Sequence, residues 1–226
     1  MTDADNPAIP AATIVLLRDA AELEVLMLHR SAQGAFGGMW VFPGGRIDAG
    51  DYPAGGDVNV AAHNAAVRET HEEAGLTISP DGFVWFAHWL PPMAAPKRFA
   101  TWFFAARADS HSVTIDGGEI QNHQWVTPAA ALAQHAAGTI DLAPPTWISL
   151  YQVSRYRTVD AVLERLRSHA PRHYETRIGK RADGVRVAMW YGDAGYGEWD
   201  ADAAGARHRL VMTSGGFVFE NSVETY

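Results

Sequence analysis

One predicted helix, and the acidic residues near its end, constrain this chain more than any other feature. The helix is expected over residues 60–74, where Asn59 is a plausible N-cap and Gly75 is well placed to end it. Residues three and four positions apart share one face of a helix. The side chains of Glu69, Glu72 and Glu73 should therefore point to the same side.

Three carboxylates so close together repel one another unless a cation lies among them. Hard divalent ions such as Mg²⁺ or Mn²⁺ prefer oxygen ligands of this kind, so Glu69, Glu72 and Glu73 are candidate metal ligands. Arg68 precedes Glu72 by four residues and can fix its rotamer. The alternative is an acidic helix face that is simply solvated.

A second element upstream favours the metal site. The predicted strand at about 39–42 is broken by Pro43-Gly44-Gly45, and a double glycine lets the backbone approach a ligand closely. Together the two segments resemble the Nudix box, G-x5-E-x7-R-E-U-x-E-E-x-G-U, in which U is a bulky apolar residue. The matching residues are Gly45, Arg68, Glu69, Glu72, Glu73, Gly75 and Leu76.

The chain departs from that pattern at three points. Asp51 stands at the first Glu position, and Thr70 stands where an apolar residue is usual. Sixteen residues, 52–67, replace the seven of the pattern, but this insertion falls in a loop before the metal-facing part of the helix, where added length costs little closure entropy. By the resemblance, the structural positions of the box are Gly45, Asp51, Arg68 and Gly75.

The resemblance implies a hydrolase that cleaves a diphosphate linked to another group. It implies that Glu72 and Glu73 bind Mg²⁺ or Mn²⁺, joined by Glu69 and the carbonyl of Gly44. One of these carboxylates, or a downstream one, would act as the base, and Glu119 is the favoured downstream candidate. An ordinary turn acid is an equal interpretation of Glu119.

Further segments indicate a substrate. AFGGMWVFPGGRID, AVRETHEEAG, AHWLP and KRFATWFF resemble the Nudix branch that includes the peroxisomal acyl-CoA diphosphatases, although Ala100 stands where Asp is expected. CoA or acyl-CoA is therefore the favoured substrate. The alternatives are ADP-ribose, NADH or a dNTP, and a non-catalytic Nudix module that senses a ligand.

Basic and aromatic residues supply the candidate substrate contacts. Guanidinium groups suit phosphoryl oxygens. The candidates for phosphate contacts are Arg30, Arg46, Lys97 and Arg98. Phe36, Trp40 and Trp89 could offer a face to adenine, but burial in the core is the more frequent role of such aromatic residues.

The expected fold class is α/β (α+β), a Nudix α/β/α sandwich with a mixed sheet. Strands are expected at about 13–17, 25–29, 83–89 and 99–107 and before position 127, and helices after Thr127-Pro128 and at about 146–156 and 159–169. Three parts are predicted: a disordered lead-in (1–10), a Nudix domain (11–157) and an extension packed on it (158–226), which is β-rich from Ile178.

Composition excludes several classes of protein. The chain of 226 residues has no cysteine, which removes disulfides and thiolate chemistry, and its net charge of −8 argues against binding a nucleic-acid polymer. No run of eighteen apolar residues occurs, so no membrane span or membrane partner is expected, and a cytoplasmic location is predicted. The resemblance is also compatible with a homodimer.

Overall fold

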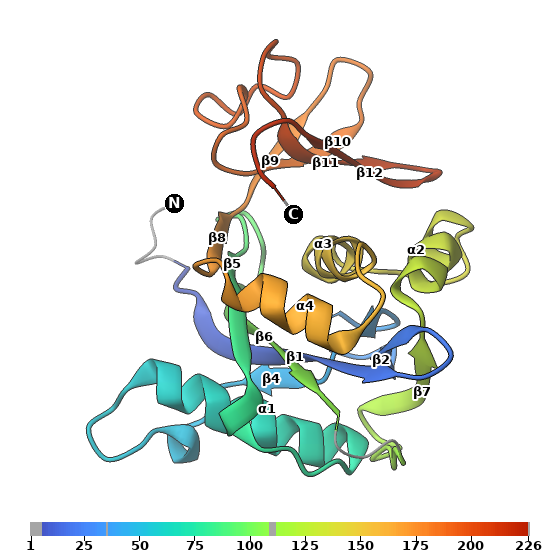
Figure 1. Ribbon diagram of the computed structural model, residues 1–226. Helices are drawn as coiled ribbons and strands as arrows, with labels where there is room; N and C mark the ends of the chain where they lie inside the picture. Colours follow the sequence, from blue (N-terminus) through green and yellow to red (C-terminus); the bar gives the residue numbers. More distant parts are fainter. Residues whose placement is uncertain (1–5, 35, 109–111, 226) are drawn as a thin grey trace.

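The computed structural model describes residues 6–34, 36–108 and 112–225. Its main feature is a large mixed sheet with the strand order β3-β2-β1-β6-β5-β8, to which β4 adds beside β1 and β7 beside β2 (Figure 1). The pairs β1–β6 and β5–β8 are parallel and the others are antiparallel. These strands are β1 (Ile9–Asp19), β2 (Leu23–Arg30), β3 (Trp40–Val41), β4 (Gly44–Arg46), β5 (Val84–Leu90), β6 (Phe99–Arg107), β7 (Ile120–Val126) and β8 (Arg172–Glu175).

Helices cover both faces of this sheet. Helix α1 (Val58–Ala74) lies on one face, and α3 (Pro144–Val153) and α4 (Val159–Arg167) lie on the other, with α2 (Pro128–Ala136) beside α3 (Figure 1). The alternation of β1 explains the two layers, because Ile14 and Leu16 face the α1 side whereas Val15 and Leu17 face the α3 and α4 side. The predicted mixed α+β fold is confirmed.

The ends of α1 show one correct and one wrong prediction. As predicted, Gly75 ends the helix. It adopts the left-handed conformation, with φ 67°, and its N–H donates to His71 O. The N-cap, however, is Asp57 and not Asn59, because the Asp57 side chain accepts from the N–H of Asn59. The helix therefore begins two residues earlier than expected.

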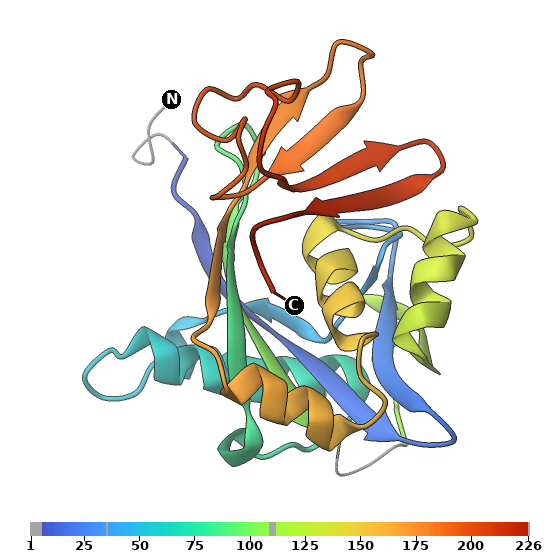
Figure 2. The same cartoon turned by 45° about the horizontal axis from the view of Figure 1, so that its top comes forward.

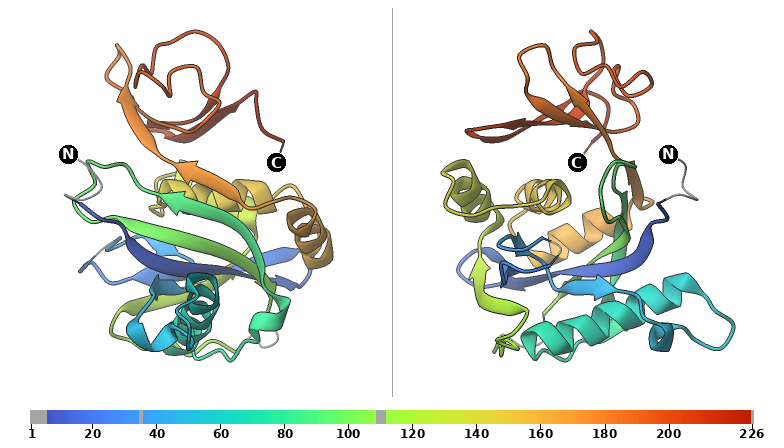
Figure 3. Two further views of the ribbon diagram at one scale, coloured as in Figure 1. Left: turned by 90° about the vertical axis from the view of Figure 1, so that its left-hand side faces the viewer. Right: turned by 180° about the vertical axis from the view of Figure 1, so that it is seen from behind.

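A second, smaller sheet follows the large one. It contains β9 (Arg177–Lys180), β10 (Arg186–Met189), β11 (His208–Thr213) and β12 (Gly216–Asn221), paired in the order β12-β11-β10-β9. The sequence predicted strands here but no pairing. Figures 2 and 3 show this sheet beyond α2 and α3, on the side of the large sheet opposite to α1.

Aromatic contacts attach the small sheet to the rest of the molecule. Trp190, which is fully buried, packs against Trp89 of β5 and Tyr174 of β8 at ring-centroid distances of 5.5 and 5.4 Å. Phe219 of β12 packs against Tyr151 of α3 at 5.2 Å. The hydrophobic core on this side of the large sheet is therefore continuous with the extension.

The chain start differs from its prediction. Residues 1–5 of the expected lead-in lie outside the described residues, but β1 already begins at Ile9, and the Asn6 side-chain amide donates to the carbonyls of Met93 and Ala95. The division into parts at 157 and 158 stays a prediction. In the described part of the chain, no helix is long and apolar enough to cross a membrane.

Candidate active site

The double glycine of β4 lies directly against the acidic side of α1. The N–H of Gly44 donates to Glu73 Oε2 at 2.9 Å. A Cβ on Gly45 would stand 2.5 Å from Cδ of Glu69, and one on Gly44, whose φ is 154°, would stand 2.6 Å from Cα of Thr13. A side chain at Gly44 would therefore collide with the backbone of β1, and one at Gly45 would have to push the Glu69 carboxylate aside.

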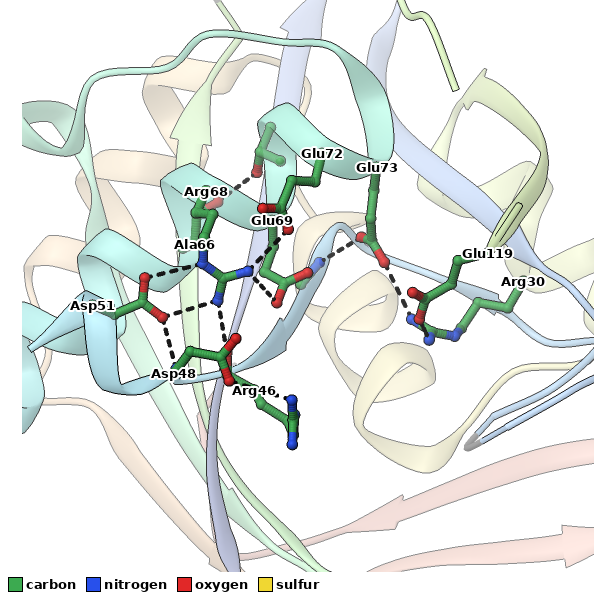
Figure 4. A network of polar contacts seen from close by, with 12 residues as sticks. Arg30, Arg46, Asp48, Asp51, Ala66, Arg68, Glu69, Glu72, Glu73 and Glu119 are labelled. Carbon is green, nitrogen blue, oxygen red and sulfur yellow. Dashed lines mark hydrogen bonds and ion pairs between the residues drawn. The ribbon is translucent and has the colours of Figure 1, made fainter. Parts of the chain in front are cut away.

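Arg68 organises the outer part of the acidic cluster (Figure 4). Its Nε and Nη2 donate to the two carboxylate oxygens of the buried Asp51, at 3.0 and 2.9 Å, and Nη2 also donates to Arg46 O. Its Nη1 donates to Glu69 and Glu72 at 2.8 and 3.0 Å. These contacts, with that of Asp51 the largest, raise the pKa of Arg68 and keep it charged.

Asp51 therefore keeps a structural contact with Arg68 across the long insertion. It belongs to the short 3₁₀ turn 49–51, and its Oδ2 also accepts the N–H of Asp48 at 2.8 Å. Burial raises the pKa of Asp51, but the hydrogen bonds from Arg68 and Asp48 outweigh it and leave the pKa below its ordinary value.

Arg30, at the end of β2, joins the inner part of the cluster. Its Nη1 donates to Glu73 Oε1 at 3.2 Å, and Nη2 pairs with Glu119 (Figure 4). Arg30 thus brings Glu119, in the segment before β7, to the same place as the α1 carboxylates. Half of the Glu119 side chain remains exposed, whereas Glu73 is almost fully buried.

Burial dominates the electrostatics of the two inner glutamates. It raises the pKa of Glu73 to about 7, against the N–H of Gly44 and the charge of Arg30, while Glu69 adds to the rise. The pKa of Glu69 is raised too, first by burial and then by Glu72, against Arg68. Burial therefore disfavours the charged form of both carboxyl groups.

A cavity of about 680 Å³ opens beside these groups, within the usual size range of ligand pockets. Its charged lining includes Arg30, Arg46, Arg68, Glu69, Glu72 and Glu119. Its apolar lining includes Leu90, Pro91, Phe99, Phe103, Pro145 and Ile178. Glu73 is not among its lining residues but lies directly behind them, against the lining residues Gly44 and Arg30.

The four candidate phosphate contacts do not all reach this cavity. Arg30, Arg46 and Lys97 line it, and the Arg46 side chain is 60% exposed, within 3.4 Å of Asp48. Arg98 is 2% exposed, and its guanidinium donates to the carbonyls of Pro91 and Asn6. Its role is to fasten the chain start to the β5–β6 loop, so its prediction as a phosphate contact was wrong.

The three aromatic candidates for adenine contacts also differ in whether they line the cavity. Phe36 lines the cavity and is 45% exposed. Trp89 touches the cavity, but it is 2% exposed and stacked on Tyr174 at 3.8 Å, so it belongs to the core. Trp40 stacks on His29 at 5.2 Å and is not among the lining residues.

Sequence reasoning missed two contributions to the cavity. Asp48 follows Arg46 in the loop after β4, and its proximity to the double glycine was the only available signal. Thr176 and Ile178 come from the extension, about a hundred residues after the acidic helix. No motif in the sequence marks them.

The NUDIX domain family model matches residues 7–145. The chain belongs to this family. The prediction that it is a Nudix hydrolase, a class of enzyme that acts on pyrophosphate bonds, is confirmed at the level of the family. No curated protein matches the chain.

Solved structures share the Nudix fold at low sequence identity. A NUDIX hydrolase from Alicyclobacillus acidocaldarius matches with a TM-score of 0.61 and 21% identity, over 70% of this chain and 96% of that chain. The NUDIX domain of NrtR from Shewanella oneidensis, in a cocrystal with ADP ribose, matches with a TM-score of 0.50 and 19% identity, over 69% and 97% of the two chains. At these identities the likeness shows the fold alone.

Nudix enzymes generally use divalent metals, and the donor chemistry of the cluster fits such an ion. Glu69 and Glu72 line the cavity and offer only oxygen ligands, and a bound cation would offset the cost of keeping the buried carboxylates of Glu69 and Glu73 charged. As the side chains lie, no three of the described His, Asp and Glu residues gather around one point, and Arg30 and Arg68 pair with carboxylates of the cluster.

Proposed function

We propose that this protein hydrolyses the diphosphate bond of a nucleoside diphosphate-linked compound with the help of Mg²⁺ or Mn²⁺. The observation that carries the proposal is the contact between the double glycine of β4 and the acidic side of α1, at the wall of one large cavity. Glu69, Glu72, Glu73 and the carbonyl of Gly44 would hold the metal. When bound, a divalent ion neutralises charge on diphosphate oxygens and lowers the pKa of a water molecule.

The protein's own residues have separate tasks in this reaction. Arg30, Arg46 and Lys97 bind the non-bridging phosphate oxygens from the cavity wall. A water oxygen forms a bond to one phosphorus, and the bond from that phosphorus to the bridging oxygen breaks. The bridging oxygen leaves on the second phosphate, and the water proton passes to a carboxylate.

Glu119 is our candidate for that carboxylate. It lines the cavity, it is half exposed to solvent, and the ion pair with Arg30 holds it near Glu73. Its partner Arg30 would release it or share it as phosphate oxygens arrive, since one guanidinium can serve both groups. Glu119 is thus placed for contact with water in a way that the buried Glu73 is not.

CoA or acyl-CoA is the favoured substrate class. The sequence supports it through the likeness to the branch of acyl-CoA diphosphatases, and the cavity supports it through a charged side that continues into an apolar side. ADP-ribose, NADH and dNTPs remain the competing substrates. The NrtR domain that carries ADP ribose in its cocrystal shares this chain's fold but decides nothing about its substrate.

A panel of diphosphates tests the reaction. CoA, octanoyl-CoA, ADP-ribose, NADH and dNTPs are incubated with Mg²⁺ or Mn²⁺, and the phosphorylated products are quantified. Glu72→Gln and Glu73→Gln should each lower kcat/KM by about 100-fold or more, because each loses a metal ligand. Glu164→Gln, at an exposed position of α4, is the matched control and should retain full activity. Inert wild-type protein across the panel, or full activity in both cluster variants, would contradict the proposal.

A further inference from the structure

The segment 112–119, which leads into β7, is attached to two elements of the site. The N–H of Thr114 donates to the carbonyl of Ala74, the last residue of α1, at 2.9 Å. Near the other end of the segment, the N–H of Ser31 donates to Glu119 O at 2.8 Å. The segment therefore connects the end of the acidic helix with the end of β2.

Within this segment, the Asp116 carboxylate accepts two successive backbone N–H groups. Its Oδ2 accepts from Glu119 N and its Oδ1 from Ile120 N, each at 2.9 Å. Gly117, with φ 70°, allows the chain to turn back over the carboxylate. Both oxygens of Asp116 are thus bound to the backbone at the start of β7.

These bonds fix the backbone from which the Glu119 side chain leaves. The N–H of Glu119 is held by Asp116 and its carbonyl by Ser31. The Glu119 carboxylate then pairs with Arg30, which also donates to Glu73 (Figure 4). A general base needs such pre-organisation, because a displacement of about 1 Å at a catalytic centre can lower the rate about 100-fold.

Asp116 does not itself face the reacting groups. Glu119 lines the cavity, whereas Asp116 is not among the lining residues. With its two oxygens bound to N–H groups of the backbone, Asp116 can affect the reaction through the position of Glu119.

We propose that Asp116 is a positioning residue that holds Glu119 where it accepts the proton of the attacking water. This inference rests on the proposed hydrolysis with Glu119 as its base, and it adds the residue that places this base. Loss of the Asp116 carboxylate frees the backbone of Glu119 while the phosphate contacts and the metal ligands stay in place. The change should therefore appear in kcat and not in KM.

The test measures steady-state kinetics of Asp116→Ala and Asp116→Asn on the best substrate of the diphosphate panel, with Mg²⁺. Asp116→Ala should lower kcat by about tenfold and change KM less than about twofold. Asp116→Asn retains an acceptor for one of the two N–H groups and should lower kcat by only about threefold. Mn²⁺ binding should stay within about twofold of wild type in both variants, because neither loses a metal ligand.

A double variant separates positioning of the base from a general structural effect. Glu119→Gln alone should lower kcat by about 100-fold, the usual order for loss of a general base. In that background Asp116→Ala should cause no further loss, because the group that it positions is already inactive. Asp183→Ala is the matched control: Asp183 also accepts a nearby backbone N–H, that of Val185 at 3.0 Å, but does not line the cavity. It should keep the kcat of wild type.

Four results would overturn the inference. They are wild-type kcat in Asp116→Ala, an equal further loss in the Glu119→Gln background, a parallel loss of Mn²⁺ binding, and wild-type kcat in Glu119→Gln. The last of these would leave the proposed hydrolysis standing, whereas inert wild-type protein across the panel would contradict the hydrolysis and the inference together. If Asp116→Ala does not fold, Asp116→Asn carries the same comparisons.

Discussion

At the scale of single residues, the site depends on glycines and on paired charges. Gly44 and Gly45 were recognisable from the sequence because the Nudix pattern marks them, and the structure gives the physical reason in their contact with Glu73 and Glu69. The role of Arg98 was predicted wrongly, because a basic residue beside an aromatic strand gives the same sequence pattern whether its side chain faces a ligand or a backbone carbonyl. Only the path of the chain start, which brings Asn6 O to its guanidinium, separates the two roles.

Gly45→Ala tests this close approach. The added methyl group should displace the Glu69 carboxylate and lower kcat/KM by about 10- to 100-fold, since a shift of about 1 Å at a catalytic centre has effects of that order. Gly50→Ala is the matched control, because its Cβ would meet no atom within 4 Å. Wild-type rates in both variants on the same substrate would contradict this role of Gly45.

At the scale of secondary-structure elements, the sequence predicted the helices whose ends carry a capping residue. Gly75 ends α1 and Thr127 caps α2, as local chemistry requires. The start of α1 was misjudged because Asp57 and Asn59 are both good caps, and the choice depends on tertiary contacts: the Asn59 side chain accepts the indole N–H of Trp102 instead. The pairing of β8 with β5 joins segments about 85 residues apart, and short strands give no signal for so distant a partner.

Asp57→Ala tests the corrected start of the helix. Loss of the cap should lower the free energy of unfolding by about 1 kcal/mol, whereas Asp57→Ser, which retains an acceptor, should lose much less. Urea denaturation followed by circular dichroism measures both. An unchanged midpoint in the Ala variant would show that Asp57 does not cap α1.

At the scale of the whole molecule, the extension is part of the site. The family model ends at residue 145, yet the cavity wall continues to Ile178, and the core beneath it includes Trp190 and Leu210. The sequence showed a β-rich stretch there but nothing of its contact with the cavity, because that contact depends on the fold of the entire chain. The stability of the extension should therefore affect catalysis.

Asp193 provides a test of that stability. Burial would raise the pKa of its carboxyl, but hydrogen bonds from Arg209 and from the N–H groups of His208 and Gly195 hold it below the ordinary 3.8. Because the folded-state pKa is lowered, the stabilisation is present in full above pH 3.8 and is lost as pH falls through the folded-state pKa.

Asp193→Asn should therefore lower the free energy of unfolding at neutral pH by about 3–5 kcal/mol, because it leaves Arg209 buried and without its charged partner. The difference in the free energy of unfolding between variant and wild type should decrease below pH 3.8. Thermal melting across a pH series measures this. A stability difference that stays constant down to the lowest pH at which both proteins still fold would contradict the role of the Asp193 charge.

Binding of Mn²⁺ tests the proposed metal site on α1 without requiring that the substrate be known. Mn²⁺ is titrated into EDTA-treated and desalted protein, and free Mn²⁺ is followed by electron paramagnetic resonance. We predict saturable binding by wild type and Glu164→Gln, weakened at least about tenfold in Glu72→Gln and Glu73→Gln. Equal Mn²⁺ binding by all four proteins, or no binding by wild type, would contradict the assignment of the acidic face of α1 as the metal centre.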